Sequence, residues 1–485
     1  MSPTVRIRMY RQGLGDCFLL TFPRQNGASQ PDFYMLIDCG VIGGTQDVSQ
    51  KMKAVVDDIF RTTGGHLDLL VGTHEHWDHI SGFNQVRAVF DKFTISNVWL
   101  AWTEDPNNAI AQQLRQGRAA RLSALRTALT RVEGAGFTDQ AAGIRQILSF
   151  FGEEPGLAPG LGAAGQAAGA STTQDAMHYL SSRQDADVRY CLPKDPPQSL
   201  DGVDGVRVYV FGPPQDLKLI KMSDPTKKGQ ETYGISAISV EDAFFAAVSP
   251  AGGDSTYNQQ KALSYPFDAF YQVSPDEAKS PQHDDFFRRY YSFEDKDPDA
   301  WRRIDSDWLN VASELALNLD SDTNNTSLVL AFELGDPGSG KVLLFTADAQ
   351  VGNWLSWGSL SWNVQEPGKP PRTITSNDLL ARTVFYKVGH HGSHNATLRQ
   401  QGLELMVSDE LVAMIPVDHS MAVKKRWNMP FPDLYTRLQA KTEGRVIRID
   451  DGIPSRQDAS TLTEAEWQAF IKSVTQTDLY IEYSI

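Results

Sequence analysis

Three histidines and an aspartate lie within six residues of one another, at His74, His76, Asp78 and His79. Imidazole nitrogens and carboxylate oxygens are the ligands that zinc, manganese and iron take in proteins. The chain has only ten histidines in 485 residues, which argues against a polar turn that is histidine-rich by chance. We expect His74 and His76 to bind one metal ion and Asp78 and His79 to bind a second.

Two further sets of ligand-type side chains also follow apolar segments. Asp348 comes shortly after the apolar run 342–345, although an isolated aspartate at such a place often caps a helix. His390 and His391 follow the apolar segment 383–388. All three motifs share one arrangement, in which a buried strand ends at a metal-type ligand. Together they predict a single binuclear site.

The elements expected to position these residues are strands that alternate with helices, which indicates a layered α/β fold. A helix is predicted over 52–61, and a capping box at Thr463 predicts another near the C-terminus. The predicted strands lie at 5–10, 17–22, 33–37, 67–71, 206–211, 327–332, 341–346, 383–388 and 479–483.

Two long stretches of different composition interrupt these strands. One has a helical pattern followed by a segment rich in Gly and Ala at 152–172, and the other is rich in Asp, Lys, Pro and aromatic residues. We therefore predict a core with two insertions. Its parts are a first half at 1–100, an insertion at 101–202, a core strand at 203–215, a second insertion at 216–320, a second half at 321–455, and a C-terminal helix and strand at 456–485.

Composition and charge exclude several classes of protein. Hydrophobic residues make up 41% and charged residues 22% of the chain, which excludes a disordered or fibrous protein. No apolar run is long enough to span a membrane, and no N-terminal secretory signal is visible. Three scattered cysteines without a CxxC pair favour a reducing, cytoplasmic location. The net charge of −15 opposes long-range attraction of nucleic acids but leaves room for a local basic groove.

The set of motifs resembles the metallo-β-lactamase superfamily, and more narrowly the hydrolase domain of ComEC-type DNA-uptake proteins. The resemblance covers about 1–100, 203–214 and 322–455. It rests on QGLGDC at 12–17, LIDCG at 36–40, HEHWDHISG at 74–82, NNTSLVL at 324–330, LLFTAD at 343–348, KVGHHGS at 387–393 and the stretch 430–452.

This resemblance implies an αββα sandwich, in which two packed β-sheets have helices outside, with a dinuclear site at the sheet edge. The implied cofactor is two divalent metal ions, zinc with manganese as the alternative. By position, His74 and His76 should bind metal one; Asp78, His79 and His391 should bind metal two; and Asp348 should bridge them. Asp78 and His390 are the catalytic candidates, and Asp38, Asn324 and Ser393 should hold the ligands in place.

One departure concerns metal one. Many members of the superfamily have a further histidine ligand between the first motif and the bridging aspartate. Here that interval contains only His178 and His283, neither in a matching context. ComEC-type domains often lack this histidine as well and have an Asn-x-x-Ser pattern, which Asn324 and Ser327 match. Metal one would then be weakly held, or completed by water or substrate.

Two other departures lie outside the ligand motifs. ComEC-type domains usually have a His-Pro pair where this chain has Met429-Pro430. His419 either compensates for it or has an ordinary surface or core position. The transmembrane part of the DNA-uptake proteins is absent.

The expected chemistry is hydrolysis by a metal-bound hydroxide, without a protein nucleophile. Two metal ions lower the pKa of water toward about 7 and neutralise charge on a phosphoryl or carbonyl oxygen. The chain has no Gly-x-Ser-x-Gly elbow and no Walker phosphate loop. A phosphodiester, in nucleic acid or a nucleotide, is the leading substrate. The alternatives are a small ester, lactone or phosphocholine-like substrate, and a non-catalytic scaffold of the same fold.

Three segments are candidates for substrate selection. The first is a predicted helix with arginines that either contact phosphates or form a solvated face. The second, 286–291 with 301–303, mixes aromatic residues and arginines, which suits either base stacking or an ordinary packed helix. The third, 351–357, forms either an aromatic wall beside the metals or part of the core. The arginines of the first segment are Arg115, Arg118, Arg121, Arg126 and Arg131.

Overall fold

The computed structural model describes residues 4–25, 32–134, 138–153, 172–222, 273, 275–291, 318–365 and 370–485. The chain divides into two compact units. One comprises residues 1–117, 149–225 and 320–485, and the other 118–148 and 226–319. Most of the Gly- and Ala-rich segment, much of 216–320 and the whole of 301–303 lie outside the described residues.

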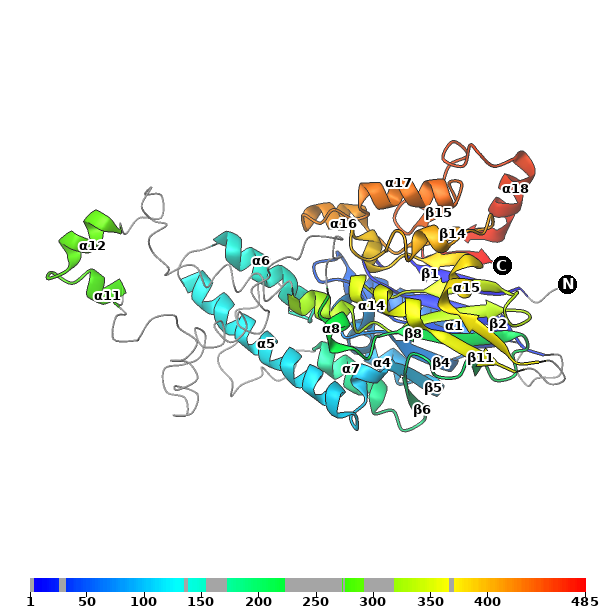
Figure 1. Ribbon diagram of the computed structural model, residues 1–485, viewed down its shortest axis with the longest axis horizontal. Coiled ribbons are helices and arrows are strands. Elements are labelled where there is room, and N and C mark those ends of the chain that lie inside the picture. Colours follow the sequence, from blue (N-terminus) through cyan, green and yellow to red (C-terminus); the bar gives the residue numbers. More distant parts are fainter. Residues whose placement is uncertain are drawn as a thin grey trace. The chain divides into compact units, whose positions relative to one another are not determined.

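Eight strands form the first sheet, in the order β16-β17-β1-β2-β3-β4-β5-β6. Strands β1, β2, β4, β5 and β6 of this sheet are labelled in Figure 1. Neighbours from β16 to β3 are antiparallel, and neighbours from β3 to β6 are parallel. The strands are β1 (Arg6–Tyr10), β2 (Phe18–Pro23), β3 (Asp32–Ile37), β4 (His66–Gly72), β5 (Thr94–Ala101), β6 (Asp187–Cys191), β16 (Val474–Gln476) and β17 (Tyr480–Ser484).

Three of these strands, β6, β16 and β17, come from ranges that the sequence placed outside the core. The C-terminal strand β17 pairs with β1 along its whole length, from Arg6 opposite Ser484 to Tyr10 opposite Tyr480. β6, from the range 101–202, pairs in parallel with β5. Strands β17 and β6 therefore extend the first sheet on either side of the strands that were predicted for it.

Seven strands form the second sheet, in the order β15-β14-β13-β10-β9-β8-β7. Neighbours from β10 to β15 are parallel, and those from β7 to β10 are antiparallel. The strands are β7 (Gln198–Ser199), β8 (Val206–Gly212), β9 (Val329–Leu334), β10 (Lys341–Phe345), β13 (Thr383–Lys387), β14 (Val412–Ile415) and β15 (Val446–Arg448); a separate pair is β11 (Ser361–Val364) with β12 (Arg372–Thr375).

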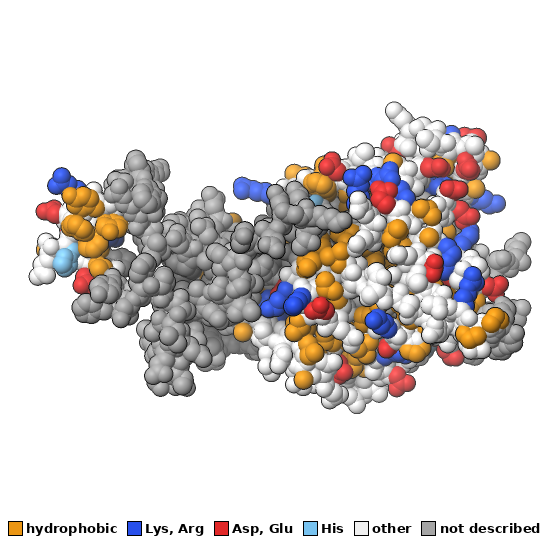
Figure 2. All heavy atoms as spheres, viewed as in Figure 1, with side chains coloured by type: hydrophobic (Ala, Val, Ile, Leu, Met, Phe, Trp, Pro, Cys, Tyr) orange, Lys and Arg blue, Asp and Glu red, His pale blue; other side chains and the backbone are white. Residues whose placement is uncertain are grey.

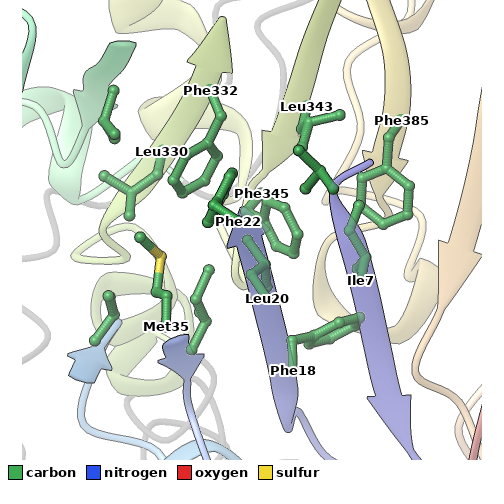
Figure 3. Close-up of a cluster of buried hydrophobic side chains, with 14 of the residues drawn as sticks. Ile7, Phe18, Leu20, Phe22, Met35, Leu330, Phe332, Leu343, Phe345 and Phe385 are labelled. Atoms are coloured by element: carbon green, nitrogen blue, oxygen red, sulfur yellow. The ribbon is translucent and has the colours of Figure 1, made fainter. Parts of the chain in front are cut away.

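Apolar side chains from both sheets meet in one buried cluster (Figure 3). The ring centroids of Phe18 and Phe345 lie 5.8 Å apart, and those of Phe22 and Phe332 also 5.8 Å. Because successive side chains of a strand point to opposite faces, alternate residues of β4 serve two clusters. Leu69 belongs to the cluster between the sheets, whereas Leu70 packs in the cluster that includes α1.

Helices flank the sheets. Met52, Val55, Val56 and Ile59 of α1 are buried in a cluster with side chains of β4 and β5. The helices and 3₁₀ turns are α1 (Val48–Thr63), α2 (Trp77–Ile80), α3 (Gly82–Gln85), α4 (Arg87–Phe90), η1 (Trp102–Glu104), α5 (Ala109–Gly134), α6 (Thr138–Ser149), α7 (Thr173–Ser181), α8 (Leu217–Ile220), α11 (Pro275–Ala278), α12 (Asp284–Tyr290), α14 (Val351–Ser356), η4 (Trp357–Ser359), α15 (Ser376–Ala381), η5 (His390–Gly392), η6 (Leu403–Leu405), α16 (His419–Lys424), α17 (Pro432–Lys441) and α18 (Glu464–Ser473).

The prediction of an α/β fold class is confirmed by these mixed sheets and their helices.

In the second unit, hydrophobic side chains are exposed on α12 (Figure 2), where Phe286 and Tyr290 are 54% and 44% exposed. Among the described residues, no helix has the length and apolar character needed to cross a membrane.

Candidate metal centre

The predicted ligands follow the carboxyl ends of parallel strands in both sheets. The segment with His79 follows β4, Asp348 follows β10, and His391 follows β13. Asp38 is the residue directly after β3. In α/β proteins ligands bind at the carboxyl ends of such strands, because loops from neighbouring strands meet there. The two sheets therefore bring residues more than 300 positions apart into one site, as shown by Asp78 and His391.

Four buried side chains form a group that could hold a metal ion: Asp16, His79, Asp348 and His391. One ligand atom from each lies within 4.8 Å of the others. His79 Nε2 is 3.2 Å from Asp348 Oδ2, and His391 Nε2 is 4.0 Å from the same oxygen. Three of the four are among the predicted ligands, and Asp16 is an addition that the sequence reasoning missed.

Asp16 reaches the cluster because its loop packs directly on the loop that follows β4. Its N–H donates to the carbonyl of Asp78 at 2.9 Å, and its own carbonyl accepts from Gly40 N–H at 2.9 Å. A Cβ on Gly15 or Gly40 would lie within 2.6 Å of backbone atoms across this contact. The glycines beside Asp16 in QGLGDC were the available signal for such a close approach.

Asp38 holds His79, as expected for a supporting residue. His79 Nδ1 lies 2.8 Å from Asp38 Oδ2. The Asp38 carboxylate also accepts hydrogen bonds from the Thr73 N–H at 2.8 Å and from the Thr73 hydroxyl at 2.7 Å. With Nδ1 donating to Asp38, the lone pair of His79 is on Nε2, the atom near Asp348. This arrangement of carboxylate and histidine is common at metal sites.

The two adjacent histidines after β13 have different surroundings. His391 Nδ1 donates to the carbonyl of Pro416 at 2.8 Å, and its Nε2 is 2.8 Å from Asp78 Oδ2. His390 Nδ1 instead lies 3.2 Å from Gln350 Nε2 and 3.0 Å from the Ser393 hydroxyl. Only the ring of His391 belongs to the group that could hold a metal ion.

We therefore expect His391→Ala to lower metal occupancy more than His390→Ala. The first change removes a nitrogen from the cluster, whereas the second leaves the cluster atoms in place and removes a ring that lies beside it. Metal analysis of the two purified variants after loading with zinc checks this. Equal loss, or greater loss in His390→Ala, would mean that the roles are reversed.

His74 and His76 lie beside this group. His74 Nε2 is 3.1 Å from His76 Nδ1, and His74 Nδ1 is 3.1 Å from the Thr73 hydroxyl. The ring centroids of His74 and His79 are 4.2 Å apart. The structure thus brings together all six predicted ligands.

Aromatic rings that the sequence reasoning did not single out surround His76. Its ring lies 5.4 Å from that of Phe150 and 5.0 Å from that of Phe151, and Phe150 stacks on Trp427 at 5.0 Å. By contrast, the tryptophans of the predicted aromatic segment 351–357 are buried, and Trp357 Nε1 donates to Asn353 Oδ1 at 3.0 Å. That segment belongs to the core, which was one of the two alternatives.

A buried lysine at the end of β13 offsets part of the negative charge. Lys387 Nζ forms an ion pair with Asp16, lies 3.5 Å from Asp348 Oδ1 and donates to the carbonyl of Ala347 at 2.8 Å. Burial by itself would lower the pKa of Lys387, but Asp16 and Asp348 outweigh burial and raise it. The lysine is therefore charged at neutral pH and holds both carboxylates in place.

Burial and the neighbouring charges set the protonation of the other groups. Burial lowers the pKa of His76 to about 3 and that of His390 to about 4, so both rings are neutral at pH 7. For His79, burial alone would lower the pKa, but Asp348 and Asp16 raise it well above its usual value.

Strained backbone is concentrated at this site. Asp38, Ala347, His390 and His391 have φ angles of 56°, 46°, 44° and 52°, in the left-handed region that residues other than glycine rarely adopt. Such strain persists only where the surrounding structure enforces it, and it is typical of functional sites. Here it turns the chain sharply after the strands and directs the side chains into the cluster.

The chemistry of the unpaired atoms fits a divalent cation. Buried ligand-type atoms are normally hydrogen-bonded, yet several at this site have no hydrogen bond within the described part of the chain. Imidazole nitrogens together with carboxylate oxygens are the donor set of zinc and manganese sites. The unpaired atoms are Asp16 Oδ1, His76 Nε2, Asp78 Oδ1, His79 Nε2, Asp320 Oδ1 and Asp348 Oδ2.

The predicted arginine helix does not present a continuous exposed row. Arg115 donates to the carbonyls of Thr103 and Asp105, and Arg118 and Arg121 are buried. Arg126 is exposed, and the side chain of Arg131 lies outside the described residues.

His419 has a structural contact that bears on one departure from the family pattern. Its Nδ1 donates to the carbonyl of Met429 at 2.9 Å, so its ring supports the turn that contains Met429-Pro430 rather than the metal centre.

No known protein-family model matches this chain, and no curated protein matches it.

Proposed function

We propose that this protein is a dinuclear metal-dependent hydrolase of the metallo-β-lactamase type, acting on a phosphodiester. The observation that carries the proposal is the buried group of Asp16, His79, Asp348 and His391, whose ligand atoms lie within 4.8 Å of one another. The two packed sheets with flanking helices support the αββα arrangement that the resemblance implies. The motifs also resemble those of ComEC-type hydrolase domains.

In this proposal His79, His391 and Asp78 would hold metal two, and His74 and His76 would hold metal one. The resemblance gives Asp348 the role of a ligand shared by both ions, and its Oδ2 lies 3.2 Å from His79 Nε2 and 4.0 Å from His391 Nε2. Divalent ions bound here supply Lewis acidity, which lowers the pKa of water and neutralises charge on the substrate oxygen. Asp16, paired with Lys387, adds a carboxylate that balances the charge of the ions.

The protein's own groups then position the substrate and move protons. His390 Nδ1 lies 3.2 Å from Gln350 Nε2 and 3.0 Å from the Ser393 hydroxyl, and these contacts hold the neutral ring beside the cluster. In this proposal the ring would form a hydrogen bond to the substrate through Nε2 and stabilise the charge that develops there. The main-chain N–H of His390 donates to Asp348 Oδ1 at 2.9 Å, so the same residue also fixes the orientation of the bridging carboxylate.

A small ester, lactone or phosphocholine-like substrate is the second candidate, and one observation favours it. Arg115, Arg118 and Arg121 do not form an exposed cationic row. A long polyanion would have to find its contacts elsewhere on a protein of net charge −15. A small substrate needs only the metal centre and the aromatic rings of Phe150, Phe151 and Trp427 beside it.

We expect about two divalent ions per chain after reconstitution with zinc or manganese, and hydrolysis of a phosphodiester that stops when a chelator removes them. Elemental analysis and a screen of bis-p-nitrophenyl phosphate, oligonucleotides, esters and lactones test this. Activity that falls with rising salt would favour a polyanionic substrate, because screening at about 0.15 M salt acts beyond about 8 Å. Less than one ion per chain, even after reconstitution, would refute the proposal.

A further inference from the structure

His76 differs from the other histidines proposed to bind metal. In His74, His79 and His391 the Nδ1 atom, on the side of the ring opposite the ligand nitrogen, is fixed by Thr73, Asp38 and the carbonyl of Pro416. The corresponding free nitrogen of His76 is Nε2, which is buried and has no hydrogen bond among the described residues.

The geometry determines which nitrogen of His76 faces the metal. Its Nδ1 is 3.1 Å from His74 Nε2, close to the separation of about 3.3 Å expected for two nitrogens that bind one tetrahedral ion at about 2.0–2.1 Å. A ring that binds metal through Nδ1 carries its proton on Nε2. That proton needs an acceptor, because a buried donor without one is strongly unfavourable.

Asp320 is the acceptor that the structure offers. Its Oδ1 lies 3.8 Å from His76 Nε2 and likewise has no hydrogen bond among the described residues. Its other oxygen accepts from Asn324 Nδ2 at 3.3 Å. Residues 318–324 are helical, so these two side chains are one turn apart and share a face. The segment between this helix and β9 contacts the loop that follows β4, because Leu328 N–H donates to the carbonyl of Thr73 at 2.9 Å.

We propose that Asp320 is the positioning carboxylate of His76, the counterpart of Asp38 at His79. A movement of about 1 Å brings Oδ1 to ordinary hydrogen-bond distance from Nε2. The bond fixes the ring with Nδ1 toward His74 and so strengthens the metal-one site, which lacks a further histidine. This inference rests on the proposed function, since it requires that His74 and His76 bind a metal ion.

The test is a titration of the full-length, metal-free chain with zinc against a chromophoric chelator. Asp320→Ala should weaken the binding of one of the two ions by about 10–100-fold, the usual effect of losing such a partner. Asp320→Asn should bind both ions nearly as well as the wild type, because its amide oxygen still accepts from Nε2. Asp336→Ala, which removes an exposed acid outside the metal centre, is the control and should behave like the wild type.

Other results would overturn the inference. Unchanged zinc affinity in Asp320→Ala would show that His76 does not need the carboxylate. Equal loss in Asp320→Asn and Asp320→Ala would show that the carboxylate binds the ion directly and is not a positioning group. If Asp320→Ala does not fold, Asp320→Leu fills the same space without an acceptor. Failure of the wild type to bind zinc would instead refute the proposed function.

Discussion

Replacing Asp348 with alanine is expected to lower turnover of the best substrate by at least about tenfold, which corresponds to roughly 1.4 kcal/mol in the activation barrier. Asp348 Oδ2 faces His79 and His391, and Oδ1 accepts from the main chain of His390. Its loss removes the bridge between the proposed ions and the group that orients the turn after β13. Steady-state kinetics and metal analysis of the variant measure both effects.

The fold should survive this change. The core between the sheets consists of apolar side chains such as Phe345 and Phe332, and Lys387 keeps its ion pair with Asp16 when Asp348 is removed. Circular dichroism should therefore match that of the wild type. Asp409→Ala, at an exposed carboxylate, serves as the control for loss of one negative charge. A decrease in turnover of less than tenfold would show that Asp348 is not a bridging ligand.

A single added methyl group at Gly40 should disrupt the metal centre. A Cβ at this position would lie 2.3 Å from the Asp78 carbonyl carbon and from the His79 backbone nitrogen. These are main-chain atoms, so the loop that follows β4 must move away from the loop that contains Gly40, to which Asp16 is hydrogen-bonded. We expect Gly40→Ala to reduce the free energy of unfolding by about 1–3 kcal/mol and to lower zinc affinity by at least about tenfold.

Gly43→Ala provides a matched control on the same loop. A Cβ at Gly43 meets no atom within 4 Å, and Gly43 does not have a left-handed φ angle. The Gly43→Ala variant should bind zinc with the affinity of the wild type and unfold at the same denaturant concentration. Wild-type zinc affinity in Gly40→Ala would show that the close contact between the two loops is not needed to position His79 and Asp16.

The ligand motifs could be found in the sequence because each is local. His74, His76, Asp78 and His79 are close along the chain, and an apolar strand precedes them. The strand patterns before Asp348 and His391 similarly placed those residues at strand ends. Because each motif follows an apolar strand, the sequence also predicted that the three would form one site, and the structure brings them together.

The residues that the sequence reasoning missed lack such a local pattern. Asp16 follows an ordinary glycine turn, and it becomes a candidate ligand only because that turn packs against the backbone of Asp78. Lys387 and Asp320 are single charges whose roles depend on which buried groups they face. The strand β17 joins the first sheet by pairing with β1 from the other end of the chain.

The sequence by itself therefore determined the α/β fold class and predicted a class of chemistry and a set of candidate ligands, because ligand type and strand periodicity are properties of short segments. Tertiary structure decided which acids join the histidines, as with Asp16, and which histidine of the pair His390 and His391 lies in the cluster. These outcomes depend on contacts between loops of two different sheets. No spacing within one segment encodes them, since the contacts form only when the sheets pack.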